Sequence, residues 1–218
     1  MNHRLTWVKR ELCNNKGLVC NTLAFDTCNF CSLWRISGND KNKWLPGLDP
    51  THRETMLSIG AFLQNLEYAA GNSGYDCDFV VLAASNEEEN VVEVRLVKSA
   101  IREYDVEKIK QRRTVRSNYK DEPLKNGDVK FLITSKDDSV ASLLEAGKRM
   151  ERLFLKVRER NIAQHPMTQI LEETPTNQIL PGSLGLGEPV QFILRTGYLK
   201  NYPEPVSLRR PVETFLRV

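Results

Sequence analysis

Apolar residues recur at helical spacing in two long segments of this 218-residue chain. In the first segment they follow one another at steps of three and four, which predicts a helix with one buried face. These residues are Met56, Ile59, Leu63, Leu66 and Ala70. Asp49-Pro50 is typical of a helix start, because an acid caps the first amides and proline suits the first turn. Asn72-Ser73-Gly74 supplies a residue suited to positive φ and ends the helix.

The second segment predicts another long helix, which Asp137 or Asp138 would cap and Asn161 would end. Its buried face is expected to carry Met150, Leu153, Phe154 and Val157. A shorter helix is expected from Asp105 to Arg112.

Strands are predicted where short apolar or alternating runs stand between turn signals. Residues 79–84 and 91–97 form an expected hairpin, and 130–135 and 190–195 are two further expected strands. Two regions are expected to be irregular, an N-terminal arm over 1–48 and a loop rich in proline and glycine over 172–188. The order of elements predicts an α+β fold, in which long helices cover a mixed or antiparallel sheet and extended arms lie at both ends.

The two predicted helices share an internal spacing. The separation between Gly60 and Gly74 equals the separation between Gly147 and Asn161. Two interpretations stay open at this point: chance, or two copies of one supersecondary unit.

Charge and composition narrow the classes of function. The net charge of +3 at pH 7 is too small to indicate a nucleic-acid partner. No apolar run approaches the roughly 20 residues that cross a bilayer, and the first residues lack the apolar stretch of a secretory signal. We therefore expect a soluble, cytoplasmic protein with neither membrane nor nucleic acid among its partners.

Five cysteines give no clear metal site. Cys28 and Cys31 have the two-residue gap of zinc and iron–sulfur sites, but Cys13 and Cys20 do not repeat it. An odd number of cysteines without an export signal argues against a disulfide framework. Reduced, partly buried thiols are therefore favoured, and a metal site is the alternative.

Three other features are weaker signals. The three histidines show no metal-ligand spacing, and His52 is interpreted as a surface residue at a helix start. His165 is a candidate for contact with a ligand. Residues 182–187 (GSLGLG) lack the preceding strand and following helix of a dinucleotide site and are interpreted as a loop.

Residues 112–119 (RRTVRSNY) carry the most distinctive chemistry of the chain. Three guanidinium groups stand beside two hydroxyl groups within a turn or two. Arginine presents a fork of donors that matches a phosphate, and a hydroxyl adds a short donor. The run therefore predicts capture of a phosphorylated ligand. A second basic cluster, Arg209-Arg210, favours this interpretation over a basic helix end that faces water.

Taken in order, these motifs resemble flavin-dependent nitroreductases. Residues 112–119, followed by Glu122-Pro123-Leu124, resemble the family's opening RRSxRxF…xPV. The wider arrangement resembles the Acg-like branch, in which two nitroreductase-like halves are fused. Further similar segments are 49–54 (DPTHRE), 58–61 (SIGA), 145–149 (EAGKR), 166–172 (PMTQILE), 191–197 (QFILRTG) and 205–211 (PVSLRRP).

The resemblance covers roughly residues 45–218. It implies a nitroreductase-like domain over 49–218, with half-units at about 49–104 and 105–218. It also implies that FMN is held non-covalently and moves hydride from NADH or NADPH to a quinone, a nitro compound or a similar small-molecule electron acceptor. No side chain is expected to act as a catalytic nucleophile, because the flavin carries the chemistry.

The resemblance assigns flavin-binding residues to three segments. Those expected at the phosphate, the ribityl chain and the pyrimidine edge are Arg112, Arg113, Thr114 and Arg116. Those expected to close on the phosphate from the C-terminal arm are Arg209 and Arg210. Those expected to face the isoalloxazine ring, with backbone amides near its N5, are Pro166, Met167, Thr168 and Gln169.

Departures from the family pattern define the alternatives. The family's PSxxNxQPW segment has its nearest counterpart in residues 19–25, which keep Asn21-Thr22 but lack Gln-Pro-Trp. A catalytically silent protein that binds or sequesters flavin is therefore the alternative function. The chain is also shorter than fused members, so a homodimer is one expected form. Nucleic-acid binding is disfavoured, because Tyr119 is the one aromatic residue near Arg112.

Overall fold

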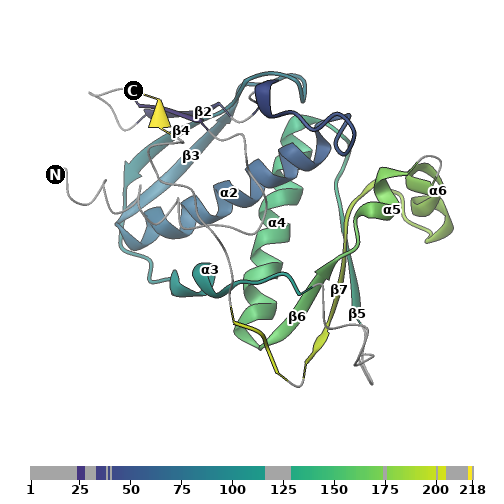
Figure 1. Ribbon diagram of the computed structural model, residues 1–218. Coiled ribbons are helices and arrows are strands. Elements are labelled where there is room, and N and C mark those ends of the chain that lie inside the picture. Colours follow the sequence, from purple (N-terminus) through teal and green to yellow (C-terminus); the bar gives the residue numbers. More distant parts are fainter. Residues whose placement is uncertain are drawn as a thin grey trace.

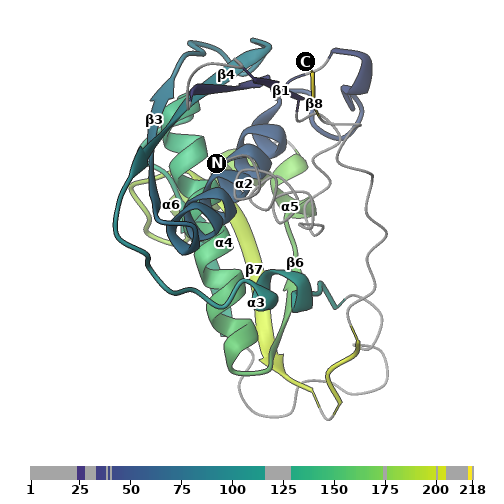
Figure 2. The same cartoon turned by 90° about the vertical axis from the view of Figure 1, so that its left-hand side faces the viewer.

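A computed structural model of the chain describes residues 24–27, 33–37, 39, 41–115, 129–173, 176–199, 201–204 and 216–217 (Figure 1). The fold is α+β, with two small sheets and two long helices. The helices α2 (Arg53–Asn72) and α4 (Val140–Glu159) pack against each other, and one sheet lies beyond each of them (Figures 1 and 2). This differs from the expected single sheet covered by helices. No helix in the described ranges is long and apolar enough to cross a membrane.

The start of α2 is set by Asp49. Its carboxylate accepts hydrogen bonds from the backbone N–H groups of Glu54, at 3.1 Å, and Thr55, at 2.9 Å. Asp49 thus satisfies amides of the first turn, as predicted, although the helix itself begins at Arg53. The residue that immediately precedes the helix is His52, whose φ of 55° lies in the left-handed region. His52 is also buried beneath Trp44, so its expected surface position is wrong.

The start of α4 differs by one residue from the prediction. Ser139, rather than Asp137 or Asp138, is the cap, and its hydroxyl accepts from the backbone N–H of Ser142 at 3.4 Å. Asp137 supports this cap by accepting from both the backbone N–H and the hydroxyl of Ser139. The helix ends as predicted, with Asn161 in the left-handed region at a φ of 52°.

The first sheet has the strand order β3-β4-β2-β1-β8. Its strands are β1 (Ala24–Thr27), β2 (Leu33–Ser37), β3 (Tyr75–Val81), β4 (Asn90–Lys98) and β8 (Leu216–Arg217). The predicted hairpin is confirmed by the antiparallel pairing of β3 with β4. The region 1–48 is not wholly irregular, because β1 and β2 join this sheet next to β4. A short 3-10 helix, η1 (Lys41–Lys43), follows them.

The second sheet has the order β5-β7-β6 and is antiparallel throughout. Its strands are β5 (Val129–Thr134), β6 (Ile162–Pro166) and β7 (Val190–Tyr198). The helices that accompany it are α3 (Glu107–Gln111), α5 (Gln169–Glu172) and α6 (Thr176–Ser183). The expectation of a loop over 172–188 is therefore wrong for α6. Pro181 is accommodated within the last turn of that helix.

The chain contains the same unit twice. In each copy a strand leads to a helix of 20 residues and then to two antiparallel strands, and the sheet orders β3-β4-β2 and β6-β7-β5 correspond. Gly60 and Gly147 are each the eighth residue of their helix. Gly74 and Asn161 each have positive φ two residues after their helix ends. The repeated spacing in the sequence thus marks two copies of one supersecondary unit.

Candidate functional site

Residues 112–115, the described part of the basic segment 112–119, lie along the edge of β6 that does not pair with β7. After α3 the chain becomes extended at Arg112, and the backbone N–H of Val115 donates to the carbonyl of Gln164 at 3.0 Å. The end of α3 is held by Arg158 of α4, whose Nε donates to the Gln111 carbonyl at 3.2 Å. These contacts bring Arg112, Arg113 and Thr114 beside the strand that leads into residues 166–169.

Arg112 is buried, with 2% of its side chain exposed. Its Nε lies 3.5 Å from Oε1 of Glu151, and its guanidinium lies 4.9 Å from the centre of the Phe154 ring. Among the described residues neither Nε nor Nη1 has a hydrogen-bond partner within normal geometry. A buried donor left unsatisfied costs about 1–3 kcal/mol. The guanidinium is therefore held by its ion pair with Glu151 and by the Phe154 ring, while Nε and Nη1 donate no hydrogen bond to a described residue.

Glu151 connects this arginine to the other long helix. Its Oε1 accepts a hydrogen bond from Nδ2 of Asn65 in α2 at 3.1 Å, and 1% of its side chain is exposed. Asn65 Nδ2 also lies 3.2 Å from the Ala61 carbonyl, which holds the amide in place. Oε2 of Glu151 and Oδ1 of Asn65 have no partner in the part of the chain that is described. Asn65, Glu151 and Arg112 are thus three buried polar side chains in contact, and they connect α2, α4 and the basic segment.

Gln164 adds a fourth buried polar group. It pairs in register with Thr196, and the alternation along β7 puts Thr196 on the same face as Leu194 and Phe192. That face packs against α4, where Phe154 lies 5.8 Å from Phe192 between ring centres. Gln164 is completely buried, and within the described ranges neither end of its amide has a hydrogen-bond partner.

We call Arg112, Glu151, Asn65 and Gln164 the buried polar cluster. Removing a charged pair from water is costly, and the pair repays that cost only with good geometry and further hydrogen bonds. Here several atoms of the cluster lack such bonds, so packing alone does not explain its presence. Sequence reasoning named Arg112 but missed the other members. One residue in the sequence could have indicated the cluster: Glu151 is a charged residue beside Met150 and Phe154, on the apolar face of the second predicted helix.

The chain returns to the basic segment after β7. The hydroxyl of Tyr202 donates to the carbonyl of Arg113 at 3.2 Å, and Nη1 of Arg113 donates to the carbonyl of Glu204. The guanidinium of Arg158 lies 4.1 Å from the centre of the Tyr202 ring. Residues 201–204 therefore run past the basic segment on their way to the second arginine cluster.

The segment 166–169 begins with Pro166, the last residue of β6. The backbone N–H of Met167 donates to the Ile193 carbonyl at 2.9 Å, and the Met167 side chain packs against Leu171 and Val190. Thr168 precedes α5, and its carbonyl accepts from the Leu171 N–H at 2.7 Å. Gln169 is exposed. Residues 112–114, which are predicted to face the phosphate, thus lie along the edge of β6. Residues 166–169, which are predicted to face the ring, lie at the end of the same strand.

Several sequence-predicted residues lie outside the described ranges. These are Asn21, Thr22, Arg116, Arg209 and Arg210, together with Cys13, Cys20, Cys28 and Cys31. In the remainder, no group of three or more histidine, cysteine, aspartate or glutamate side chains could hold a metal ion.

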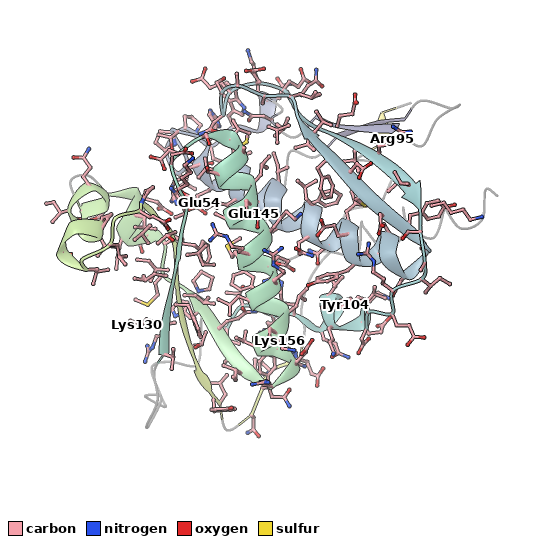
Figure 3. All side chains as sticks on the ribbon, turned by 180° about the vertical axis from the view of Figure 1, so that it is seen from behind. Glu54, Arg95, Tyr104, Lys130, Glu145 and Lys156 are labelled. Atoms are coloured by element: carbon pink, nitrogen blue, oxygen red, sulfur yellow. The ribbon has the colours of Figure 1, made fainter. Side chains whose placement is uncertain are left out.

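A cavity of about 600 Å³ lies beside the start of α2, and residues of α2, α5 and α6 line it (Figure 3 labels Glu54, one of them). Its walls combine apolar and polar residues with Arg53 and five acids, which are Asp49, Glu54, Asp138, Glu172 and Glu188. Burial raises the pKa of Glu54 despite the neighbouring Arg53 guanidinium, which lies 2.5 Å away. Three of the other acids accept local hydrogen bonds: Asp49 from the first turn of α2, Asp138 from Gln191 Nε2 at 2.5 Å, and Glu188 from the hydroxyl of Thr134.

A smaller cavity of about 400 Å³ lies against α2. Tyr68 and Tyr104 line it and stack in parallel, with ring centres 3.8 Å apart (Figure 3 labels Tyr104). Cys77 also lines it, and burial raises the pKa of this thiol to about 12, so the thiol stays protonated at neutral pH. Cys77 is the third residue of β3, as Gln164 is the third residue of β6. The cavity thus adjoins, in the first unit, the strand position that Gln164 occupies in the second.

Comparison with models of known protein families gave no match, and comparison with curated protein sequences gave none either.

Proposed function

We propose that this chain binds FMN non-covalently and acts as an oxidoreductase of the nitroreductase type. The bound flavin would accept hydride from NADH or NADPH and pass reducing equivalents to a quinone, nitro or similar organic acceptor. The structure has an α+β fold with a doubled helix–strand–strand unit, and a relation of this unit to the halves of fused nitroreductases is part of the proposal.

The observation that carries this proposal is the meeting of two segments at β6. Val115 bonds to Gln164 along the edge of the strand, and Met167 follows its last residue. A phosphorylated ring compound needs cationic donors at one end and backbone donors at the other. The proposed holders are Arg112, Arg113 and Thr114 for the phosphate side, and residues 166–169 for the ring.

The buried polar atoms support the fit of such a group. A flavin offers phosphate and ring oxygens that accept hydrogen bonds, and Nη1 of Arg112 is a buried donor without a partner among the described residues. The contact of Tyr202 with Arg113 brings the chain back toward this side before it continues to Arg209 and Arg210. Those two arginines are proposed to complete the phosphate site.

The test is an absorption spectrum of the freshly purified protein, followed by mass analysis of any released pigment. The proposal expects a yellow protein that releases FMN. Addition of NADH or NADPH without oxygen should bleach the pigment, and a quinone or nitro compound should restore it. A yellow protein that neither coenzyme bleaches would be a flavin-sequestering protein. A colourless protein that does not take up added FMN would refute the proposal.

A further inference from the structure

Two side chains of α4, Glu151 and Phe154, contact the guanidinium of Arg112. Oε1 of Glu151 lies 3.5 Å from its Nε and the centre of the Phe154 ring lies 4.9 Å from its guanidinium, whereas neither Nε nor Nη1 has a hydrogen-bond partner in the described part of the chain. A guanidinium fixed in this way cannot turn to satisfy its remaining donors. An acceptor oxygen brought by a ligand would complete them.

Glu151 is itself held in place. Nδ2 of Asn65 donates to its Oε1 at 3.1 Å across the contact between α2 and α4. The carboxylate that faces Arg112 is therefore oriented by a residue of the other structural unit. Its position does not depend on a mobile surface side chain, because both Asn65 and Glu151 are buried.

From this geometry we propose that Glu151 is a positioning residue for the proposed flavin site. Its carboxylate beside Nε orients the guanidinium, whose buried and unpaired Nη1 would donate to an acceptor oxygen of the cofactor. Asn65 acts one step further back, by orienting Glu151. This inference rests on the proposed function, and it assigns a role to two residues that would not touch the flavin.

A purely structural role for the pair is the competing explanation. Buried ion pairs contribute little net stability, and apolar residues of similar volume often replace them without loss. A structural role would therefore be served equally well by any good packing between α2 and α4. A positioning role instead requires the charge of Glu151 at this place.

The chain contains a matched control for this distinction. Gln64 and Glu151 are each the twelfth residue of their helix, and Asn65 and Arg152 are each the thirteenth. Gln64 Oε1 accepts from Nη1 of Arg152 at 2.7 Å, which mirrors the bond between Asn65 and Glu151. Loss of this mirrored bond disturbs the same helix contact without changing the carboxylate that pairs with Arg112.

The experiment compares FMN affinity in Glu151→Gln and Gln64→Met, measured by quenching of FMN fluorescence, with a thermal melt of each protein as a check of folding. We expect Glu151→Gln to weaken FMN binding by about tenfold or more, the usual scale for loss of a group that orients a charged ligand contact. Gln64→Met should stay within about twofold of the unaltered protein. Equal weakening in the two variants would overturn the positioning role.

A second variant covers the case in which Glu151→Gln does not fold. Asn65→Ala keeps both charges and removes the bond that orients Glu151 together with the bond to the Ala61 carbonyl, so it should weaken FMN binding by less than Glu151→Gln but measurably. Affinity equal to that of the unaltered protein would overturn the inference. If the unaltered, folded protein binds no FMN at all, the proposed function fails, and this outcome is distinct from FMN binding that is insensitive to Glu151 and Asn65.

Discussion

Gly60 and Gly147 face each other where α2 and α4 cross, and each excludes any larger residue for the same reason. A Cβ atom at Gly60 would lie 2.1 Å from the carbonyl oxygen of Leu144, and one at Gly147 would lie 2.1 Å from that of Leu57. The two α-carbons stand so close that each would lie 3.0 Å from the Cβ added to the other residue. The contact is reciprocal, as in a two-fold symmetric interface formed within one chain.

Replacement of Gly60 by alanine should therefore separate the helices. The added methyl group meets backbone atoms, which cannot move aside as a side chain can. We expect a loss of roughly 1–3 kcal/mol in the free energy of unfolding, the usual cost of overpacking. Urea denaturation measures it. Gly187→Ala is the control, because no atom lies within 4 Å of its added Cβ. Equal stability of the two variants would contradict the close crossing.

Asn161 should tolerate glycine better than alanine. Its φ of 52° places it in the left-handed region, which costs an ordinary residue roughly 1–2 kcal/mol. Asn161→Ala is expected to lose about 1 kcal/mol in the free energy of unfolding, and Asn161→Gly less. Its side chain also accepts from Arg158. If glycine proves the more destabilising substitution by denaturant unfolding, that hydrogen bond outweighs the backbone conformation.

The carboxylate of Asp137 should make the stability of the folded protein depend on pH. The hydroxyl of Ser139 and nearby donors hold its pKa down, from 3.8 to about 2. Because the folded-state pKa is the lower one, the stabilisation is present above pH 3.8 and is lost as the pH falls toward 2. The melting temperature of Asp137→Asn should therefore be below that of the unaltered protein at neutral pH. The difference should shrink in acid, and a difference that is constant with pH would contradict the assignment.

The two arginine clusters should act together on the proposed cofactor. Replacing Arg112 and Arg209 by alanine in one protein is expected to release the pigment, because a partly dehydrated phosphate needs cationic donors. The visible spectrum after gel filtration measures retention. Alanine at Arg95 and Lys130 removes the same charge from exposed positions away from the centre of α4 (Figure 3), and this control should stay yellow. Full pigment in the Arg112 and Arg209 variant would refute their assigned roles.

Helical periodicity predicted the centre of the fold well. The apolar steps through Met56 and Met150 mark the buried faces of α2 and α4, and the signals at Gly74 and Asn161 mark where these helices end. Figure 3 shows the opposite side of α4, where the charged Glu145 and Lys156 face outward. These signals are local, so they need no knowledge of the partner surface.

The missed elements depend on partners that are distant in the sequence. β1 and β2 are short and become strands by pairing with each other and with β4. β6 is short as well, and its buried Gln164 and its His165 give it no apolar run or apolar–polar alternation that would predict a strand. Likewise, the sequence indicates Arg112 as a phosphate-binding residue but gives no sign that its side chain is buried. Its burial beside Glu151 follows only once α3, α4 and β6 are packed.

The parallel pairing of β8 with β1 has a kinetic consequence. Phe25 stands opposite Leu216 in the register, so this edge of the first sheet joins segments from nearly opposite ends of the sequence. Contacts of such long range form slowly, because the intervening chain must first lose much of its freedom. The central helices can associate before this happens. Closure of the β1 edge is therefore expected to be the last step of folding, and amide hydrogens there should be the last to gain protection in a pulse-labelling experiment.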